Sequence, residues 1–136
     1  MEQQKQAVSY SSKVIQEAAH PKNMTRMVAS DACGIVHGCC GDTMEIYLRL
    51  AGDRIKGASF MTDGRESAIA CGSILTTMLP GLLVEEASKI TPEDLIAVLD
   101  GLPKSKVHCA KLTVNTLQEA IANWRSRGGN LEQADN

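Results

Sequence analysis

The segment 43–62 constrains the fold most, because polar and apolar side chains alternate along two short runs that are joined by a turn. Such alternation is typical of strands that bury one face. In the first run every second residue is apolar: Met44, Ile46, Leu48 and Leu50. Residues 51–54 have the composition of a turn, and residues 55–62 form a second run that buries Ala58 and Phe60. We therefore predict an antiparallel β-hairpin with one face in the core.

Helices are predicted where apolar residues recur at helical spacing between boundary signals such as His20-Pro21, Pro80-Gly81 and Thr91-Pro92. The predicted helices are residues 10–20, 66–79, 92–100 and 108–125. A further strand is expected near residues 26–36, where small and apolar types alternate. Together these elements predict an α+β domain, in which helices cover one face of a small three-stranded antiparallel sheet.

The length of 136 residues fits one domain that buries enough surface to fold without a disulfide or a metal. We expect this domain to span residues 1–127 and residues 128–136 to form a disordered tail. A net charge of −2, with one Trp, two Tyr and one Phe, does not favour nucleic-acid binding. No secretory signal or membrane span is recognised, and the odd number of cysteines, five, favours a reducing, cytoplasmic location.

Residue types that ligate metals gather in three segments at predicted element boundaries: residues 38–42, 63–66 and 106–109. A hairpin returns the chain to its start, so the first two segments are expected to lie close together. Cys40, Asp42, His108 and Cys109 then supply two sulfurs, one oxygen and one nitrogen, which suit zinc or an iron–sulfur centre. The start of a helix would also favour the thiolate form of Cys109.

At these residues the chain resembles the U-type iron–sulfur cluster assembly scaffolds, the family of IscU and the amino-terminal domain of NifU. The resemblance covers most of the chain, and several separate motifs follow the family's order. The matching segments are residues 10–15 with 20–23, Cys40-Gly41-Asp42-Thr43-Met44, Gly64 with residues 67–70, and Lys106-Val107-His108-Cys109. The short segment between the second and third motifs is similar to the IscU branch rather than to the zinc-dependent SufU branch.

The resemblance implies a scaffold or carrier, not an enzyme, that transiently holds iron and sulfide and passes a labile cluster, expected as 2Fe–2S, to apo acceptor proteins. A cysteine desulfurase would deliver sulfur as a persulfide to Cys109 or Cys40, and an iron donor would be a further partner. The implied ligands of the metal are Cys40, Asp42, His108 and Cys109, with Lys106 beside the site.

Arg65 departs from the family pattern, in which the second cysteine falls between Gly64 and Glu66. Arginine stays protonated and cannot ligate a metal, so it would repel ferrous iron while attracting an anionic cluster. We therefore expect weaker cluster binding and keep a second hypothesis: a regulatory or structural zinc protein that uses the same four ligands. Residues 102–106 lack the second proline and the valine of the segment recognised by the family's Hsp70 chaperone, so handling by that chaperone is not expected.

The remaining cysteines are expected to be structural. Cys71 lies on the packed face of a predicted helix, Cys33 lies in the first strand, and Cys39 should point away from Cys40 because neighbours in an extended segment alternate. A third hypothesis, a nucleophilic enzyme that uses Cys109 or Cys40 with a histidine, ranks lowest. Neighbours on a helix, such as His108 and Cys109, are not expected to face each other.

Overall fold

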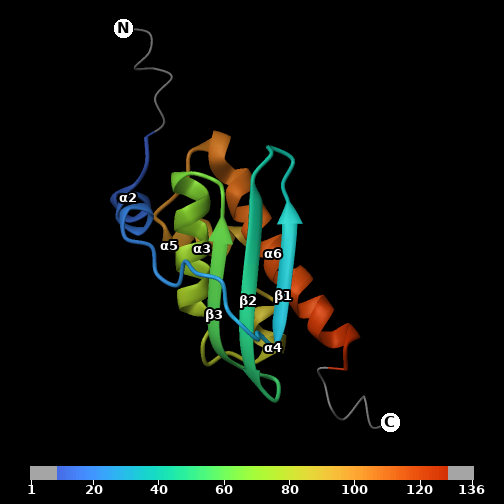
Figure 1. The fold of residues 1–136 in the computed structure, drawn as a ribbon. Helices are drawn as coiled ribbons and strands as arrows, with labels where there is room; N and C mark the ends of the chain where they lie inside the picture. The colour runs from blue at the N-terminus through green and yellow to red at the C-terminus, as the bar shows by residue number, and fades with distance from the viewer. Residues whose placement is uncertain (1–8, 129–136) are drawn as a thin grey trace, which may run out of the picture.

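The computed structural model describes residues 9–128, and its centre is a three-stranded antiparallel sheet in the order β1-β2-β3 (Figure 1). The strands are β1 (Ala32–His37), β2 (Thr43–Ala51) and β3 (Arg54–Thr62). The predicted hairpin is confirmed, because β2 and β3 pair from Met44 opposite Thr62 to Ala51 opposite Arg54. Its inward side chains are buried as the alternation predicted, except that Leu50 is half-buried; Met44, Ile46, Leu48 and Phe60 have no solvent exposure.

The helices lie mainly behind the sheet in Figure 1 and form the second layer of the fold. Their bounds are α2 Ser12–Ala19, α3 Glu66–Met78, α4 Val84–Ala87, α5 Pro92–Val98 and α6 Val107–Ser126, with a 3₁₀ helix, η1, at Lys104–Lys106. The α3 and α6 helices pack on the sheet, α2 packs against α3, and α5 packs against α6. The predicted α+β class and the helices α2, α3, α5 and α6 are confirmed, whereas α4 and η1, of four and three residues, were not predicted.

Two glycines allow the helical layer to approach the sheet. A Cβ atom on Gly34 of β1 would lie 2.5 Å from the backbone nitrogen of Ala120 in α6. A Cβ atom on Gly72 of α3 would lie 2.3 Å from the ring of Phe60 in β3. Only a residue without a side chain permits contacts this close.

The strand expected near residues 26–36 is shorter than predicted, because β1 begins only at Ala32. The preceding segment, residues 22–31, begins beside β3 instead, where the Asn23 carbonyl accepts a hydrogen bond from the backbone nitrogen of Phe60, at 2.9 Å. It then crosses in front of the strands in Figure 1 to reach β1. Within the predicted range, Ala29 has a positive φ angle of 58°, which interrupts an extended strand. Apart from Gly128, the predicted tail lies outside the described residues. In residues 9–128, no helix is both long and apolar enough to cross a lipid bilayer.

Candidate metal and thiol site

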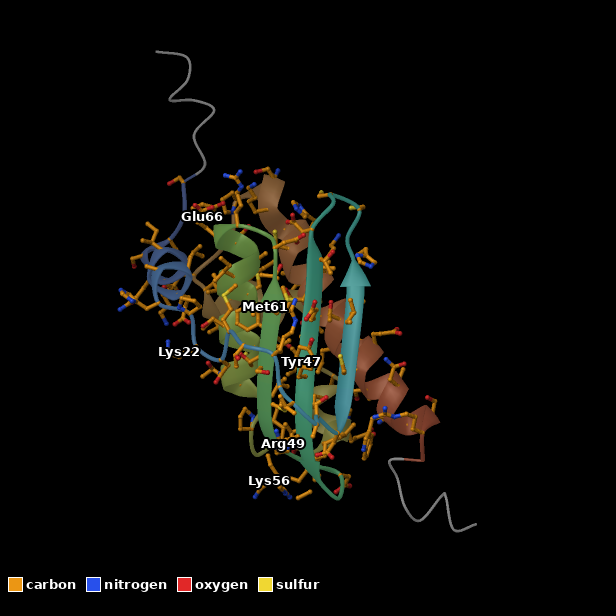
Figure 2. All side chains as sticks on the ribbon, in the orientation of Figure 1. Lys22, Tyr47, Arg49, Lys56, Met61 and Glu66 are labelled. Atoms are coloured by element: carbon orange, nitrogen blue, oxygen red, sulfur yellow. The ribbon has the colours of Figure 1, made fainter. Side chains whose placement is uncertain are left out.

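The three segments rich in ligand types meet at one end of the sheet. The β1–β2 loop, the start of α3 and the start of α6 all lie at the upper end in Figure 1. In Figure 2, Glu66 marks this end, while Arg49 and Lys56 lie near the opposite end. The antiparallel hairpin causes this arrangement, because β3 returns the chain to the end where β2 began.

Hydrogen bonding and close packing hold the two hairpin ends together. The backbone nitrogen of Thr43 donates to the Asp63 carboxylate, with an N–Oδ1 distance of 2.7 Å. The Asp42 carboxylate lies so close to Gly64 that a Cβ atom there would be 2.9 Å from Asp42 Oδ2. The expected proximity of residues 38–42 and 63–66 is therefore confirmed.

Cys109 lies in the first turn of α6 and is only 3% exposed. Its sulfur is 3.1 Å from the hydroxyl oxygen of Ser67 and 3.6 Å from Nε2 of His108. The expectation that His108 and Cys109 do not face each other is therefore wrong, because the imidazole of His108 turns back to within 3.6 Å of the neighbouring sulfur. In this conformation, however, Cys109 is buried and its sulfur is not accessible to a substrate from solvent.

Burial also sets the acidity of this thiol. Desolvation raises the pKa of Cys109 above its ordinary value, and the contact with Ser67 lowers it in part. Burial therefore opposes the thiolate that the position at a helix start was expected to favour.

Cys39 and Cys40 occupy a tight turn rather than an extended segment. The backbone nitrogen of Gly41 donates to the carbonyl of Gly38 at 3.1 Å, and both cysteines are exposed between them. Their sulfur atoms are 4.0 Å apart, so the expectation that Cys39 points away from Cys40 is wrong. The contact with Cys39 is the main cause that raises the pKa of the Cys40 thiol.

A pocket of about 280 Å³ lies between this loop and the outer face of α6. Its lining includes both thiol residues of the turn, together with Asp42, His108 and Lys111. It does not include Cys109, whose sulfur is turned toward Ser67 of α3. The pocket thus brings together three of the four predicted ligands, with Cys109 adjoining His108.

The predicted ligands share one end of the molecule without forming a finished coordination sphere. Within residues 9–128, no group of three or more His, Cys, Asp or Glu side chains is arranged to hold a metal ion. Arg65 is exposed and directly precedes α3, and Lys106 is half-buried directly before α6. The ligand set Cys40, Asp42, His108 and Cys109 therefore remains a prediction.

The other two cysteines lie away from the pocket. Cys71 is fully buried within the core face of α3, as predicted, and burial raises its pKa to about 12. Cys33 is half-buried on β1 opposite Tyr47, where desolvation raises its pKa.

Comparison with known protein families shows which family the chain belongs to. The model of the NifU-like N-terminal domain matches residues 9–130. The chain belongs to this family. Among curated members, it is 37% identical to "Iron-sulfur cluster assembly scaffold protein IscU 1" of Archaeoglobus fulgidus over 125 residues, which cover 91% of the chain and 82% of the relative. It is also 35% identical over 130 residues to the IscU scaffold protein of Aquifex aeolicus, with 92% of the chain and 82% of that protein covered.

Two solved structures share the fold of this chain. An N-terminal NifU-like protein from Brucella abortus matches with a TM-score of 0.68 at 14% identity, covering 86% of this chain and 94% of that one. A putative scaffold protein for the SUF system from Fervidobacterium islandicum matches with a TM-score of 0.66 at 17% identity, covering 82% and 96%. At these identities the similarity establishes the three-stranded sheet with its helical layer.

Several residues around this site were not predicted from the sequence. Ser67 contacts Cys109 from another element, and sequence spacing carries no signal for such a contact. Lys111, Leu112 and Asn115 line the pocket three to seven residues after His108. Their helical spacing from His108 could have identified them, because residues at i+3, i+4 and i+7 share a helix face.

Proposed function

We propose that this chain is an iron–sulfur cluster assembly scaffold or carrier, which binds iron and sulfide transiently and transfers the cluster to acceptor proteins. Membership of the NifU-like family, at 37% identity to a protein named as an IscU scaffold, carries this proposal. The convergence of Cys40, Asp42, His108 and Cys109 at one end of the sheet supports it. Two sulfurs, one oxygen and one nitrogen suit a labile centre, for which we propose the 2Fe–2S type.

Sulfur would arrive as a persulfide from a cysteine desulfurase. The thiolate of Cys40 or Cys109 attacks the outer sulfur of the donor persulfide, a new sulfur–sulfur bond forms, and the donor cysteine leaves as a thiolate. Cys40 is exposed and open to this attack, whereas Cys109 is 3% exposed and requires the site to open. An external thiol reductant then releases the bound sulfur as sulfide.

Three cations lie around the site, among the carboxylates of Asp42, Asp63 and Glu66. Arg65, Lys106 and Lys111 each lie in or beside a segment that forms the site. A cluster held by thiolates carries negative charge, which these cations stabilise. Arg65 provides no ligand, so we propose that it weakens the retention of iron while favouring the assembled, anionic cluster.

The proposed partners follow from this activity: a cysteine desulfurase, a source of iron and apo acceptor proteins. The activity is assembly and transfer without turnover of a small substrate, and we propose a cytoplasmic location on the basis of the unpaired cysteines.

Anaerobic reconstitution tests the proposal. The purified chain is incubated with ferrous iron, cysteine, a cysteine desulfurase and a thiol reductant, and the visible spectrum, iron and sulfide are then measured. We expect charge-transfer bands and matched iron and sulfide in the unmodified chain, and stronger retention in Arg65→Cys. Bands in Arg65→Cys alone would contradict an active scaffold.

The zinc hypothesis makes a different prediction for the same preparations. Stoichiometric zinc in the purified chain, with no cluster after reconstitution, would favour a zinc-binding homologue. Replacement of Cys109 by Ser tests the ligand set, since we expect it to abolish cluster retention, while Cys33→Ser, distant from the pocket, should retain it. Full assembly by Cys109→Ser would remove this residue from the proposed site.

A further inference from the structure

The turn at residues 38–41 presents two thiols in the same direction. In the turn, the hydrogen bond from Gly41 to Gly38 folds the backbone around Cys39 and Cys40. Side chains at the two central positions of such a turn do not alternate as they do in a strand. Both residues are exposed, both line the pocket, and their sulfur atoms are 4.0 Å apart.

This sulfur–sulfur distance fits a shared tetrahedral metal. Two thiolates bound to one tetrahedral ion, with metal–sulfur bonds of about 2.3 Å, lie about 3.8 Å apart. The observed 4.0 Å is within a few tenths of an ångström of that value. Binding therefore requires little movement within the turn, beyond the loss of the two thiol protons to solvent.

The surroundings supply further ligands and balance the charge. Asp42 and His108 line the same pocket, so an oxygen and a nitrogen can join the two sulfurs once their side chains move toward the turn. Lys111, also in the lining, opposes the negative charge of a dithiolate. Gly41 has a φ angle of +93° and no atom within 4 Å of its built Cβ position, so this part of the turn is open to solvent.

We propose that Cys39 and Cys40 together chelate iron, so that, once the site opens to expose Cys109, it supplies three thiolates although Arg65 supplies none. This inference rests on the proposed function only for the identity of the natural metal, since the paired thiols would bind any soft tetrahedral divalent ion. Cys39 is then a ligand of the scaffold site rather than a spare thiol on the surface.

Cobalt(II) is the probe, because the intensity of its thiolate charge-transfer absorption reports how many sulfurs bind the ion. The full-length chain, reduced and oxygen-free, is titrated as the unmodified protein, Cys39→Ser and the matched control Cys33→Ser. Cys33 is on β1 outside the pocket, and circular dichroism checks that each variant folds. Because Cys39→Ser removes one of three sulfur ligands, we expect it to lose about a third of the thiolate charge-transfer absorption per bound cobalt. Cys33→Ser should lose none.

Alkylation followed by peptide mass spectrometry gives a second readout. Bound cobalt should slow the labelling of Cys39 in the unmodified chain at least as much as that of Cys40. Unchanged absorption in Cys39→Ser, equal labelling of Cys39 with and without cobalt, or no cobalt binding by the unmodified chain would each overturn the chelate. If the chain binds cobalt through Cys39 but assembles no cluster, the proposed function fails and the chelate stands. If the chain assembles a cluster but Cys39→Ser does not change cobalt binding, the chelate fails and the proposed function stands.

Discussion

Single side chains control how closely the two layers pack. Phe60 is fully buried and its ring lies against the backbone of Gly72, with built Cβ distances of 2.3, 2.5 and 2.8 Å to three ring atoms. A packed core has no space into which that ring can move. The residue at position 72 therefore decides the distance between α3 and β3.

We predict that Gly72→Ala destabilises the fold by about 1–3 kcal/mol through overpacking, despite the better helix propensity of alanine. Urea unfolding followed by circular dichroism measures this change. Gly57→Ala is the control, because its nearest atom, Cβ of Arg49, is 3.9 Å away. Equal stability of Gly72→Ala and Gly57→Ala would contradict the close contact.

The ion pair between Arg26 and Glu45 joins the segment before β1, residues 22–31, to β2. The guanidinium donates to both carboxylate oxygens, at 3.0 and 3.2 Å, and Tyr47 donates its hydroxyl to the same carboxylate. The hydrogen bond from Arg26 is the largest cause that lowers the pKa of Glu45 below its ordinary value. The ionised carboxylate is thus favoured in the folded state.

A lowered pKa in the folded state stabilises the protein above the unfolded pKa of glutamate, about 4.3, and this contribution is lost as the pH falls through the folded value. We predict that Arg26→Gln lowers the melting temperature at about pH 7 and has a smaller effect at about pH 3. Thermal unfolding at both pH values measures this, with Glu45→Gln as the partner variant. An equal loss at both values would exclude the ion pair as its cause.

At the scale of elements, caps and helix faces decide where the helices begin. The start of α5 has a complete capping box: the Thr91 hydroxyl accepts from the nitrogen of Asp94 at 3.2 Å, and the Asp94 carboxylate accepts from the nitrogen of Thr91 at 2.9 Å. Pro92 occupies the first turn, where its missing N–H has no cost. Leu95 and Leu99 then anchor this short segment in the core.

Replacement of Thr91 by Ala should remove one half of this cap and cost about 1 kcal/mol of stability. The midpoint of urea unfolding measures the loss, and Thr91→Ser, which keeps the hydroxyl, should remain close to the unmodified chain. If the serine variant loses as much as the alanine variant, the methyl group rather than the hydrogen bond stabilises the helix.

At the scale of the whole molecule, the fold separates its cysteines by accessibility. Cys39 and Cys40 are exposed, Cys33 is half-buried, and Cys109 and Cys71 are 3% and 0% exposed. Exposure and thiolate content together control the reactivity of a thiol. The two thiols of the turn are therefore the first that a sulfur donor can reach.

We predict that iodoacetamide at neutral pH labels Cys39 and Cys40 first and Cys71 last, since burial also raises the pKa of Cys71 to about 12. Peptide mass spectrometry over time gives the order, and labelling in denaturant removes the differences that come from burial. Early labelling of Cys71 in the native chain would contradict the packing of α3.

Much of this fold could be predicted from local patterns. Alternation along 43–62 and helical spacing along 108–125 identified β2, β3 and α6, because burial of one face imposes a period on each element. The strand before them was predicted to begin too early, because Ala29 adopts a positive φ angle that its residue type does not demand. Short elements such as α4 carry too few residues for a period to be seen.

The sequence by itself determined the order of the elements and the segments that carry Cys40, Asp42, His108 and Cys109, since hairpin and helix signals depend on neighbouring residues. The tertiary structure alone decided that Cys109 is buried against Ser67 and that the β1–β2 loop, whose local turn sets the neighbouring sulfurs of Cys39 and Cys40, faces α6 across the pocket. The physical reason is that burial and pKa depend on residues remote in the chain, which only packing of α3, α6 and the β1–β2 loop brings together.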